Sequence, residues 1–582
     1  MDYQKIKKVH MVYKTHLDIG FTDLGQRVLD RYVNEYIPHS VRLALELNTR
    51  EQRKFIWTVG SYLIDYYLKH ASATACRELE QAIEDGHICW HALACTTHTE
   101  LLDMDLFEYS MNIGEKLDQR FHKRTIAAKM TDVPGHTIAI VDVMATRGIQ
   151  FLHIGVNASS MVPKVPQTFV WKHGENDIIV QYSTQYGSPG YVEGMNEVLE
   201  FAHTGDNMGP QSAEDIECEF ARIQELYPNA VVEASTLDEY AKALVRAKQC
   251  LPVVEEEIGD TWIHGIASDP WKISRYEALI QLKDKWQSEG QFDSNCSYYD
   301  DYMMGLMLIA EHTWGLDYKK YLADFKNWTK ADFKKARKDD ITTLEFLTNR
   351  NAQMLEVLNL DFKRYRNGHF TGSYAQYESS HEEQRMYLDK AIVSLPQDKK
   401  LEAISAMDNC SPIQEDLQGD IIAINQRVYI SGWSIQIDGT GALTRLERDG
   451  KNWSKNGSIG QLCYENFNAL NCVQNYYSYN RAFYENGCWS EGDFSKPGLE
   501  CVENLEHGIY NFGVQKIVRK GKELLICLIG DEDAVTNYGS PKIAQIKYRF
   551  DADTVKCDLS WFEKDANRMP EALWFDFSLD VE

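Results

Sequence analysis

Two short segments carry side chains that could bind a divalent metal ion. His16 and Asp18 stand two residues apart at the end of one apolar run, and Asp132 ends another. Side chains at i and i+2 point to the same side of an extended strand, so His16 and Asp18 can bind one ion together. Imidazole and carboxylate donors suit zinc, and three protein ligands with one exchangeable position are typical of a catalytic zinc site.

Each of these residues also has a simpler interpretation. The chain has 17 histidines and 87 acidic residues, so an isolated His-x-Asp triplet is more often a surface or hydrogen-bonded pair. Two such segments, each after an apolar stretch, favour a metal site. Pro134 and Gly135 could form no more than a tight turn, and we expect His136 to orient a carboxylate ligand rather than to bind the ion.

Residues 1–297 must bring these side chains to one edge of a sheet. Apolar runs at 9–13, 54–57, 88–90, 126–130, 151–154 and 177–182 alternate with helical patterns at 26–45, 73–85, 105–121 and 213–227. This alternation predicts a parallel sheet or β/α barrel. Polar residues that follow such strands gather at the C-terminal mouth of the barrel, where active sites form.

The pattern changes twice beyond this first region. Residues 298–395 contain helical stretches at 321–338, 341–358 and 382–392, which predict a helical bundle. Residues 396–419 are rich in Gln, Asp, Pro and Ser, as in a linker. Residues 420–582 alternate apolar and polar residues between turn signals, which predicts a β-sandwich-like domain, and the strand-like end means that it could be truncated.

Composition argues against several classes of partner. The formal charge of -26, from 61 basic and 87 acidic residues, repels phosphate backbones and anionic lipid surfaces. No run reaches the ~18 apolar residues of a membrane span, and no secretory signal precedes the first strand. Thirteen cysteines without a CxxC pair are typical of reduced thiols. We therefore expect a cytoplasmic protein without nucleic-acid or membrane partners, and a homo-oligomer is left open.

The two segments also carry a resemblance to a known family. The sequence HLDIG at 16–20, the sequence TDVPGHT at 131–137, their separation and the order barrel, helices, β-domain resemble family 38 glycoside hydrolases, the class II α-mannosidases. The resemblance implies a seven-stranded β/α barrel, a three-helix bundle and β-sandwich domains. It also implies one zinc ion held by His16, Asp18, Asp132 and a later histidine, with Asp132 acting as the nucleophile as well.

The later histidine has two candidates. The family places it near the start of the helical region, before a Gly-containing turn, where this chain has His312 followed by Gly315. His264, followed by Gly265, resembles instead the His-Gly pair that shapes the family's sugar subsite. We prefer His312, although ligand spacing alone does not separate the two.

Glycosidic cleavage needs a second carboxyl group that protonates the leaving oxygen, and its pKa must be raised by partial burial near aromatic residues. Asp269 and Asp260 lie in the late barrel region where the family places this role. Glu100 and Asp103 resemble a loop that contacts substrate, with Glu100 as the alternative acid. Any of the four could instead cap a helix or lie at the surface.

Three tryptophans flank these polar residues. Trp262, Trp271 and Trp314 could stack on sugar rings, although tryptophans in a barrel protein are more often part of its core. Together with His264 and Asp103 they are the candidate substrate-binding residues.

The motifs depart from the family pattern. Phe21 stands where the family usually has Trp, and Pro134 and Thr137 stand where its second motif usually has Phe and Ser. The leading hypothesis is a zinc-dependent retaining glycosidase acting on an α-linked oligosaccharide or glycoside, most simply an α-mannosidase, although another sugar with a vicinal diol would fit. The alternatives are a metal-dependent polysaccharide deacetylase and a non-catalytic carbohydrate-binding protein. Manganese, cobalt or calcium would also suit the oxygen ligands.

Overall fold

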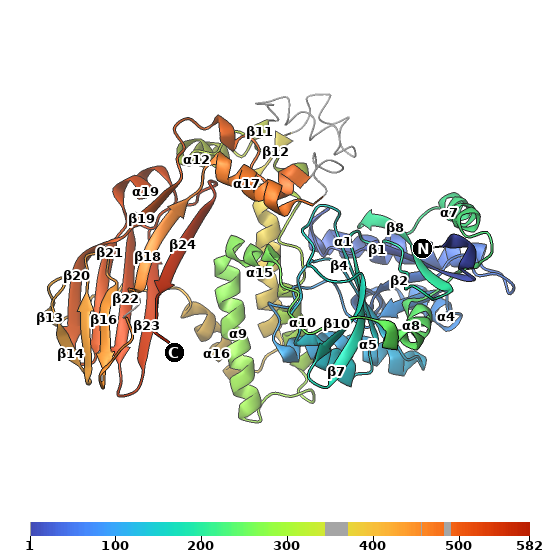
Figure 1. Cartoon of the computed structure of the whole chain (residues 1–582), viewed down its shortest axis with the longest axis horizontal. Helices are drawn as coiled ribbons and strands as arrows, with labels where there is room; N and C mark the ends of the chain where they lie inside the picture. The colour runs from blue at the N-terminus through green and yellow to red at the C-terminus, as the bar shows by residue number, and fades with distance from the viewer. Residues whose placement is uncertain (1, 344–370, 455–456, 482–489, 582) are drawn as a thin grey trace. The chain divides into compact units, whose positions relative to one another are not determined.

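The computed structural model describes residues 2–343, 371–454, 457–481 and 490–581 of the 582-residue chain. The chain divides into two compact units. Unit 1 comprises Met1–Tyr321, Gln376–Met407 and Asn480–Asn486, and unit 2 comprises Leu322–Ala375, Asp408–Tyr479 and Gly487–Glu582. Unit 1 contains mainly parallel strands with helices, whereas the strands of unit 2 are antiparallel (Figure 1).

Unit 1 is built on two five-stranded sheets. The first has the order β3-β2-β1-β8, with β9 also paired to β1, and the second has the order β10-β6-β7-β5-β4. Every pair is parallel except β6 with β7, which form a hairpin. The strands are β1 Lys8–His16, β2 Trp57–Gly60, β3 Ile88–His91, β4 Ala127–Asp132, β5 Phe151–Val156, β6 Thr168–His173, β7 Asn176–Ser183, β8 Glu197–Asp206, β9 Val231–Ala234 and β10 Val253–Val254.

Backbone hydrogen bonds join the two sheets at both sides. The amide of Ala92, just after β3, donates to the carbonyl oxygen of Ala127 in β4 at 3.0 Å. On the other side, Gly190 after β7 exchanges two backbone hydrogen bonds with Leu199 in β8. The strands therefore form a curled, mainly parallel sheet, as the alternating pattern predicts. Closure as a barrel of seven strands stays a prediction.

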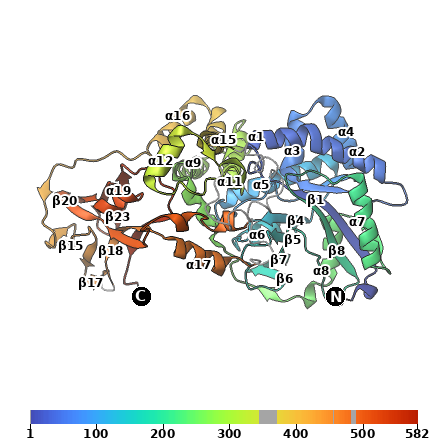
Figure 2. The same ribbon diagram turned by 90° about the horizontal axis from the view of Figure 1, so that it is seen from above.

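Helices lie on the outside of these strands: α4 packs against β3, α7 against β9, and α8 against β1 and β8 (Figure 2). Their buried residues follow the helical period, for example Leu106, Ile113 and Leu117 in α5. Three of the predicted helices are confirmed within two residues, and the fourth is divided by a π-helical turn at Tyr32–Tyr36. The helices are α1 Gly25–Arg31, α2 Ile37–Leu47, α3 Ser61–His70, α4 Ala73–Glu84, α5 Met104–Phe121, α6 Ile140–Thr146, α7 Ala213–Leu226 and α8 Leu237–Arg246.

Strand β8 is absent from the sequence-based prediction, as are β6 and β9. Two acidic residues, Glu197 and Glu200, interrupt the apolar run of β8. Glu200 is nevertheless buried, because it accepts a hydrogen bond from the hydroxyl of Tyr227. Glu197 pairs with His10 in β1. These partners are distant in the sequence, so the local pattern does not show that these acidic residues belong to a strand.

Long helices in unit 1 follow the strands: α9 Pro270–Ser288, α10 Tyr299–Ile309, α15 Tyr374–Val393 and α16 Gln397–Asp408. Helix α15 lies beside α9 (Figure 1), where the ammonium of Lys272 donates to Gln384 at 2.7 Å. None of the helices that the structure describes is long and apolar enough to cross a lipid bilayer.

One helix prediction and one linker prediction for this region need correction, and a second helix prediction lies largely outside the described residues. The stretch 321–338 is not one helix but the short α11 Tyr318–Tyr321 and a separate α12 Lys330–Asp339, whose N-terminus Thr329 caps. Residues 397–408, predicted as part of a linker, form α16 instead. The predicted helix at 341–358 falls almost entirely on residues that the structure does not describe. The proposed domain boundaries themselves stay predictions.

The C-terminal part of the chain is an antiparallel β-rich region, as predicted. One sheet has the order β13-β20-β21-β22-β23, and the other has the order β14-β15-β16-β18-β19 with β17 on β16 and β24 on β18. Residues of both sheets, such as Ile435 and Ile526, belong to one hydrophobic core. The strands are β13 Asp420–Ile421, β14 Val428–Ile430, β15 Trp433–Ile437, β16 Leu443–Arg448, β17 Lys451–Asn452, β18 Ile459–Asn466, β19 Gly508–Asn511, β20 Gly513–Lys520, β21 Glu523–Ile529, β22 Ile543–Phe550, β23 Val555–Phe562 and β24 Glu571–Phe577.

Candidate metal centre and active site

Three parallel strands of unit 1 each carry a carboxylate at or just after their last residue, at the same edge of the structure. Strand β1 ends at His16 and is followed by Asp18, β4 ends at Asp132, and β8 ends at Asp206. Strands β1 and β8 are neighbours, with His16 paired to Asp206. Active sites of β/α folds form at this carboxyl edge of the strands, so its side chains are the first candidates.

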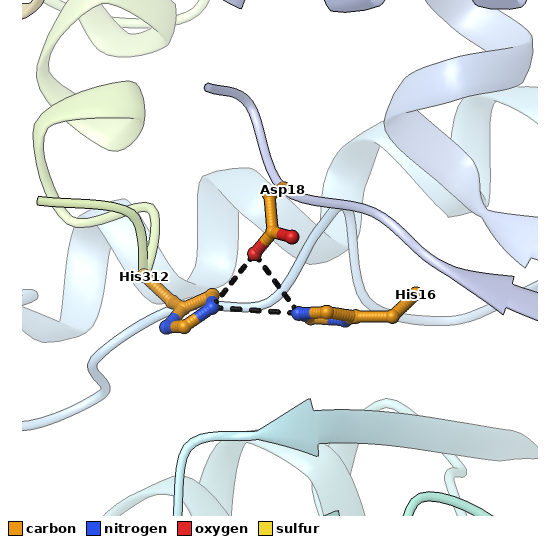
Figure 3. Close-up of side chains that lie close together, drawn as sticks. All are labelled: His16, Asp18 and His312. Atoms are coloured by element: carbon orange, nitrogen blue, oxygen red, sulfur yellow. Dashed lines mark hydrogen bonds and ion pairs between the residues drawn. The ribbon is translucent and has the colours of Figure 1, made fainter. Parts of the chain in front are cut away.

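His16, Asp18 and His312 form a compact, buried group of possible metal ligands (Figure 3). Nε2 of His16 lies 3.0 Å from Oδ1 of Asp18, and Nε2 of His312 lies 2.9 Å from the same oxygen. The two imidazole nitrogens are 3.4 Å apart. Bonds of about 2.0–2.1 Å to a tetrahedral zinc ion place its ligands about 3.3 Å from one another. The spacing of this group is close to that value.

Asp132 lies beside this group at the end of a strand of the other sheet, although the cluster with mutual metal-ligand spacing does not include it. Its Oδ2 lies 3.4 Å from Nε2 of His312 and 3.8 Å from Nε2 of His16. Its backbone has a φ of 79°, a left-handed conformation that costs a non-glycine residue about 1–3 kcal/mol. Two side chains hold the carboxylate there. Nδ2 of Asn157 donates to Oδ1 at 2.8 Å, and the hydroxyl of Tyr186 also donates to this carboxylate.

An unpaired carboxylate oxygen shows that these residues fit a cation. Among the residues that the structure describes, Oδ2 of Asp18 is buried without a hydrogen-bond partner. A buried polar atom left unsatisfied costs about 1–3 kcal/mol, and more when it is charged. A divalent ion would satisfy this oxygen, and two imidazole nitrogens with carboxylate oxygens are donors that zinc accepts.

The electrostatics of the group depend on opposite charges at short range. Burial alone would lower the pKa of His312, but the hydrogen bond with Asp18 and the charge of Asp132 outweigh burial and raise this pKa to about 9. Burial would raise the pKa of Asp18, but the imidazoles of His16 and His312 hold it well below its usual range. Protonated imidazole thus balances the carboxylates of the metal-free protein, and metal binding must release that proton.

Asp206 is a carboxylate near this group that the sequence analysis missed. Its Oδ1 is buried and has no hydrogen-bond partner in the described part of the chain. Burial and the charge of Asp18 raise the pKa of Asp206 to about 7. Gly205 and Asp206 end β8 in the same way that Asp132 ends β4, so the rule that found Asp132 would have found Asp206 if β8 had been recognised.

The turn that carries Asp18 is fixed by two polar side chains. The amide of Asp18 donates to Oδ1 of Asn207 at 3.1 Å, and Nδ2 of Asn207 donates back to the carbonyl oxygen of Asp18 at 3.0 Å. The amide of Ile19 donates to Oε1 of Glu311 at 3.0 Å. Gly20 has a φ of 130°, and a Cβ there would lie 3.2 Å from the methyl group of Thr313. The turn therefore requires glycine at this position.

Gly135 and His136 pack against the segment that follows β10. A Cβ on Gly135 would lie 2.4 Å from the backbone nitrogen of Asp260, so only glycine allows this approach. The amide of His136 donates to the carbonyl oxygen of Ile258, and its Nδ1 lies 3.2 Å from the hydroxyl of Thr99. Burial lowers the pKa of His136 to about 4. Its described hydrogen bonds go to these groups rather than to a carboxylate of the metal group.

Asp269, a predicted acid, and Asp103, a predicted substrate-binding residue, are both engaged in ion pairs. Asp269 caps α9 and accepts hydrogen bonds from Nε and Nη2 of Arg385 at 2.8 and 2.9 Å. Asp103 caps α5 and pairs with Lys283, which also binds Asp105. These contacts match the helix-capping alternative.

The other two, Asp260 and Glu100, lie near each other. Asp260 caps the 3₁₀ helix Thr261–Ser268 and accepts a hydrogen bond from the amide of Trp262 at 3.0 Å. Burial and the charges of Glu257 and Asp260 raise the pKa of Glu100. The two carboxyl groups therefore interact, and neither belongs to the metal group.

Of the three candidate tryptophans, two lie near the metal group and the third is exposed. Trp262 stacks on His312, with ring centroids 5.9 Å apart and planes 21° apart. Trp314 lies 4.8 Å from the ring of His98, which is itself 6.2 Å from the ring of His312. Trp271 is 45% exposed. Trp262 and Trp314 thus border the group.

The structure brings His312, and not His264, into the metal group. His264 is exposed on the 3₁₀ helix Thr261–Ser268 and is absent from the described clusters with metal-ligand spacing. The other such cluster joins Asp103, Asp105 and Asp284, whose shared partner is the ammonium of Lys283.

Comparison with models of known protein families shows which family the chain belongs to. The model of the N-terminal domain of family 38 glycosyl hydrolases matches residues 7–307, which is more than half of the sequence. The chain belongs to glycoside hydrolase family 38. The resemblance seen in the sequence is thereby confirmed, and family 38 membership makes this chain a glycosidase. A second model, a domain of unknown function called DUF5054, matches residues 266–558.

Solved structures agree with the family 38 assignment at the level of the fold. An α-mannosidase from Enterococcus faecalis V583 is 11% identical with a TM-score of 0.54, over 95% of this chain and 73% of that protein. A family 38 glycosyl hydrolase structure from Enterococcus faecalis is 10% identical with a TM-score of 0.53, over 98% and 74%. No curated protein sequence matches the chain.

We expect that His312→Ala weakens zinc affinity by at least ~100-fold, more than the loss of an outer-sphere partner costs, because it removes one of two nitrogen donors. His264→Ala, at an exposed position, is the matched control and keeps wild-type affinity. Competition with a fluorescent chelator measures both. A wild-type affinity in His312→Ala with a loss in His264→Ala would reverse the assignment.

Proposed function

We propose that the chain is a zinc-dependent retaining glycosidase that acts on α-linked sugars, most simply an α-mannosidase, with Asp132 as the nucleophile. The observation that carries the proposal is the place of this carboxylate, beside His16 and His312 and held by Asn157. Family 38 membership and the fold shared with an α-mannosidase from Enterococcus faecalis V583 support it.

A retaining reaction needs a carboxylate that can attack the anomeric carbon. Hydrogen bonds from Asn157 and Tyr186 orient Asp132, and the strained backbone at this residue keeps the carboxylate turned toward the site. Attack by one oxygen of Asp132 on the anomeric carbon breaks the glycosidic bond and forms a glycosyl ester, while the general acid protonates the departing oxygen. Water then hydrolyses the ester and restores the free carboxylate. Zinc held by His16, Asp18, Asp132 and His312 would supply positive charge that attracts the oxygens of sugar hydroxyls, and so would orient and distort the sugar ring.

We propose Asp206 as the general acid, in addition to the candidates drawn from the sequence. It lies at the end of β8 beside His16, and its Oδ1 is buried and unpaired among the described residues. Burial and the charge of Asp18 raise its pKa to about 7, toward the range that an acid catalyst requires. Asp260 and Glu100 stay the alternatives, whereas Asp269 is occupied by Arg385.

Finer features that the family implies are proposals as well. They are a seven-stranded barrel, a β-sandwich in the C-terminal region and a sugar subsite altered at Phe21, Pro134 and Thr137. A cytoplasmic location and the absence of nucleic-acid partners stay predictions from composition.

We expect that Asp132→Asn lowers kcat on 4-nitrophenyl α-mannoside by ~10³-fold or more, since removal of a nucleophile abolishes the covalent route. Asp142→Asn, which changes a half-exposed carboxylate bound to His173, is the control and keeps wild-type kcat. The activities of both variants and of the chelator-treated enzyme are measured on a panel of aryl glycosides and acetylated sugars. Acetate release, or glycoside cleavage that is indifferent to Asp132, would contradict the proposal.

We expect that Asp206→Asn lowers the hydrolysis of methyl α-mannoside by ~10²-fold or more, within the range that general acids contribute. Hydrolysis of 2,4-dinitrophenyl α-mannoside falls far less, because this leaving group needs little protonation. Asp260→Asn and Glu100→Gln, measured on the same two substrates, show which carboxyl group gives this contrast. An equal loss on both substrates in Asp206→Asn would refute the acid role.

A further inference from the structure

Arg481 binds two loops of unit 1 that are far from it in the sequence. It belongs to the segment Asn480–Asn486, which is part of unit 1. Nη2 of Arg481 donates to the carbonyl oxygen of Thr184 at 2.6 Å and to that of Asn157 at 3.4 Å. Nε donates to the carbonyl oxygen of Ser160 at 3.2 Å. One guanidinium group therefore joins the loop after β5 to the loop after β7.

The loop after β5 sets the orientation of Asn157. Oδ1 of Asn157 accepts hydrogen bonds from the amides of Ser159 and Ser160 at 3.0 and 2.8 Å. Because these amides need an acceptor, the side-chain oxygen of Asn157 faces them and its nitrogen points the other way. Nδ2 then donates to Oδ1 of Asp132 at 2.8 Å. The amide of Arg481 adds a hydrogen bond to the carbonyl oxygen of Ser159 at 2.9 Å. The conformation of this loop thus determines where Nδ2 of Asn157 lies relative to the carboxylate of Asp132.

The loop after β7 places the second donor. Tyr186 is two residues after Thr184, and its hydroxyl donates to Asp132. Its ring centroid lies 5.3 Å from that of His16, so the same side chain borders a metal ligand. The ammonium of Lys129 donates to the carbonyl oxygen of Tyr186 at 2.9 Å. Arg481 and Lys129 therefore both bind backbone carbonyl oxygens of this loop and fix its position.

We propose that Arg481 is a positioning residue for Asp132. Through the backbone of both loops it fixes the two donors, on Asn157 and Tyr186, that orient the carboxylate. The planar guanidinium has five donors in a rigid fork, which allows one side chain to bind several carbonyl oxygens. The strained backbone of Asp132 persists only when its surroundings over-determine it, and these loops are part of those surroundings. The catalytic part of this inference rests on the proposed function.

The test compares Arg481→Ala and Arg481→Lys with Arg147→Ala. Arg147 is the matched control, because it binds the side chains of Asn112, Glu108 and Glu115 away from the metal group. For each variant, kcat and KM on 4-nitrophenyl α-mannoside, zinc affinity by chelator competition and the thermal unfolding temperature are measured.

We expect that Arg481→Ala lowers kcat by ~10–100-fold and zinc affinity by ~10-fold, the range found when support of a metal ligand is lost, with KM changed less than about threefold. Arg481→Lys recovers little, because one ammonium cannot form the same fork of hydrogen bonds. Added guanidinium chloride at low concentration partly restores kcat in Arg481→Ala. Arg147→Ala lowers the unfolding temperature and leaves kcat and zinc affinity unchanged.

A lowered unfolding temperature in Arg481→Ala with wild-type kcat and zinc affinity would overturn the inference, since Arg481 would then stabilise the loops alone. If the wild-type enzyme cleaves no glycoside, the proposed function fails and zinc affinity decides the positioning role by itself. A loss of affinity in Arg481→Ala but not in Arg147→Ala supports the role even then, and equal affinities reject it.

Discussion

Charge balance among buried groups is the constraint on which this site depends. Asp18, Asp132 and Asp206 meet where three strands end, and like charges at such short range cannot all persist in a buried place without a counter-charge. The neighbouring carboxylates raise the pKa values of His16 and His312, and burial raises that of Asp206, so bound protons favour a smaller net negative charge. A divalent ion would supply the same compensation at neutral pH without the protons, which supports the proposal that these residues hold a metal.

Segments from distant parts of the sequence hold this arrangement together. The curled sheet brings the ends of β1, β4 and β8 to one edge, and the turn after α10 adds His312. Asn207 and Glu311 fix the turn that carries Asp18. Asn157 and Tyr186 do the same for Asp132, so every carboxylate proposed as a ligand has its own polar support. Family 38 membership supports the proposal that this site serves glycoside cleavage, which needs a positioned carboxylate.

Local patterns were enough to find some of these residues. The alternation of apolar runs and helices predicted the α/β class, and a polar residue after an apolar run located Asp18 and Asp132. Asp206 was missed because β8 carries buried Glu200, whose partner Tyr227 is distant in the sequence. The role of Arg481 could not be predicted from any local pattern, because it rests on contacts with residues about 300 positions earlier in the chain.

The most direct test of the central claim is anomalous diffraction at the zinc absorption edge from crystals of the zinc-loaded protein. The account predicts one strong peak within about 2.0–2.2 Å of Nε2 of His16 and His312 and of carboxylate oxygens of Asp18 and Asp132. A peak elsewhere, or no peak among these four side chains, would contradict it.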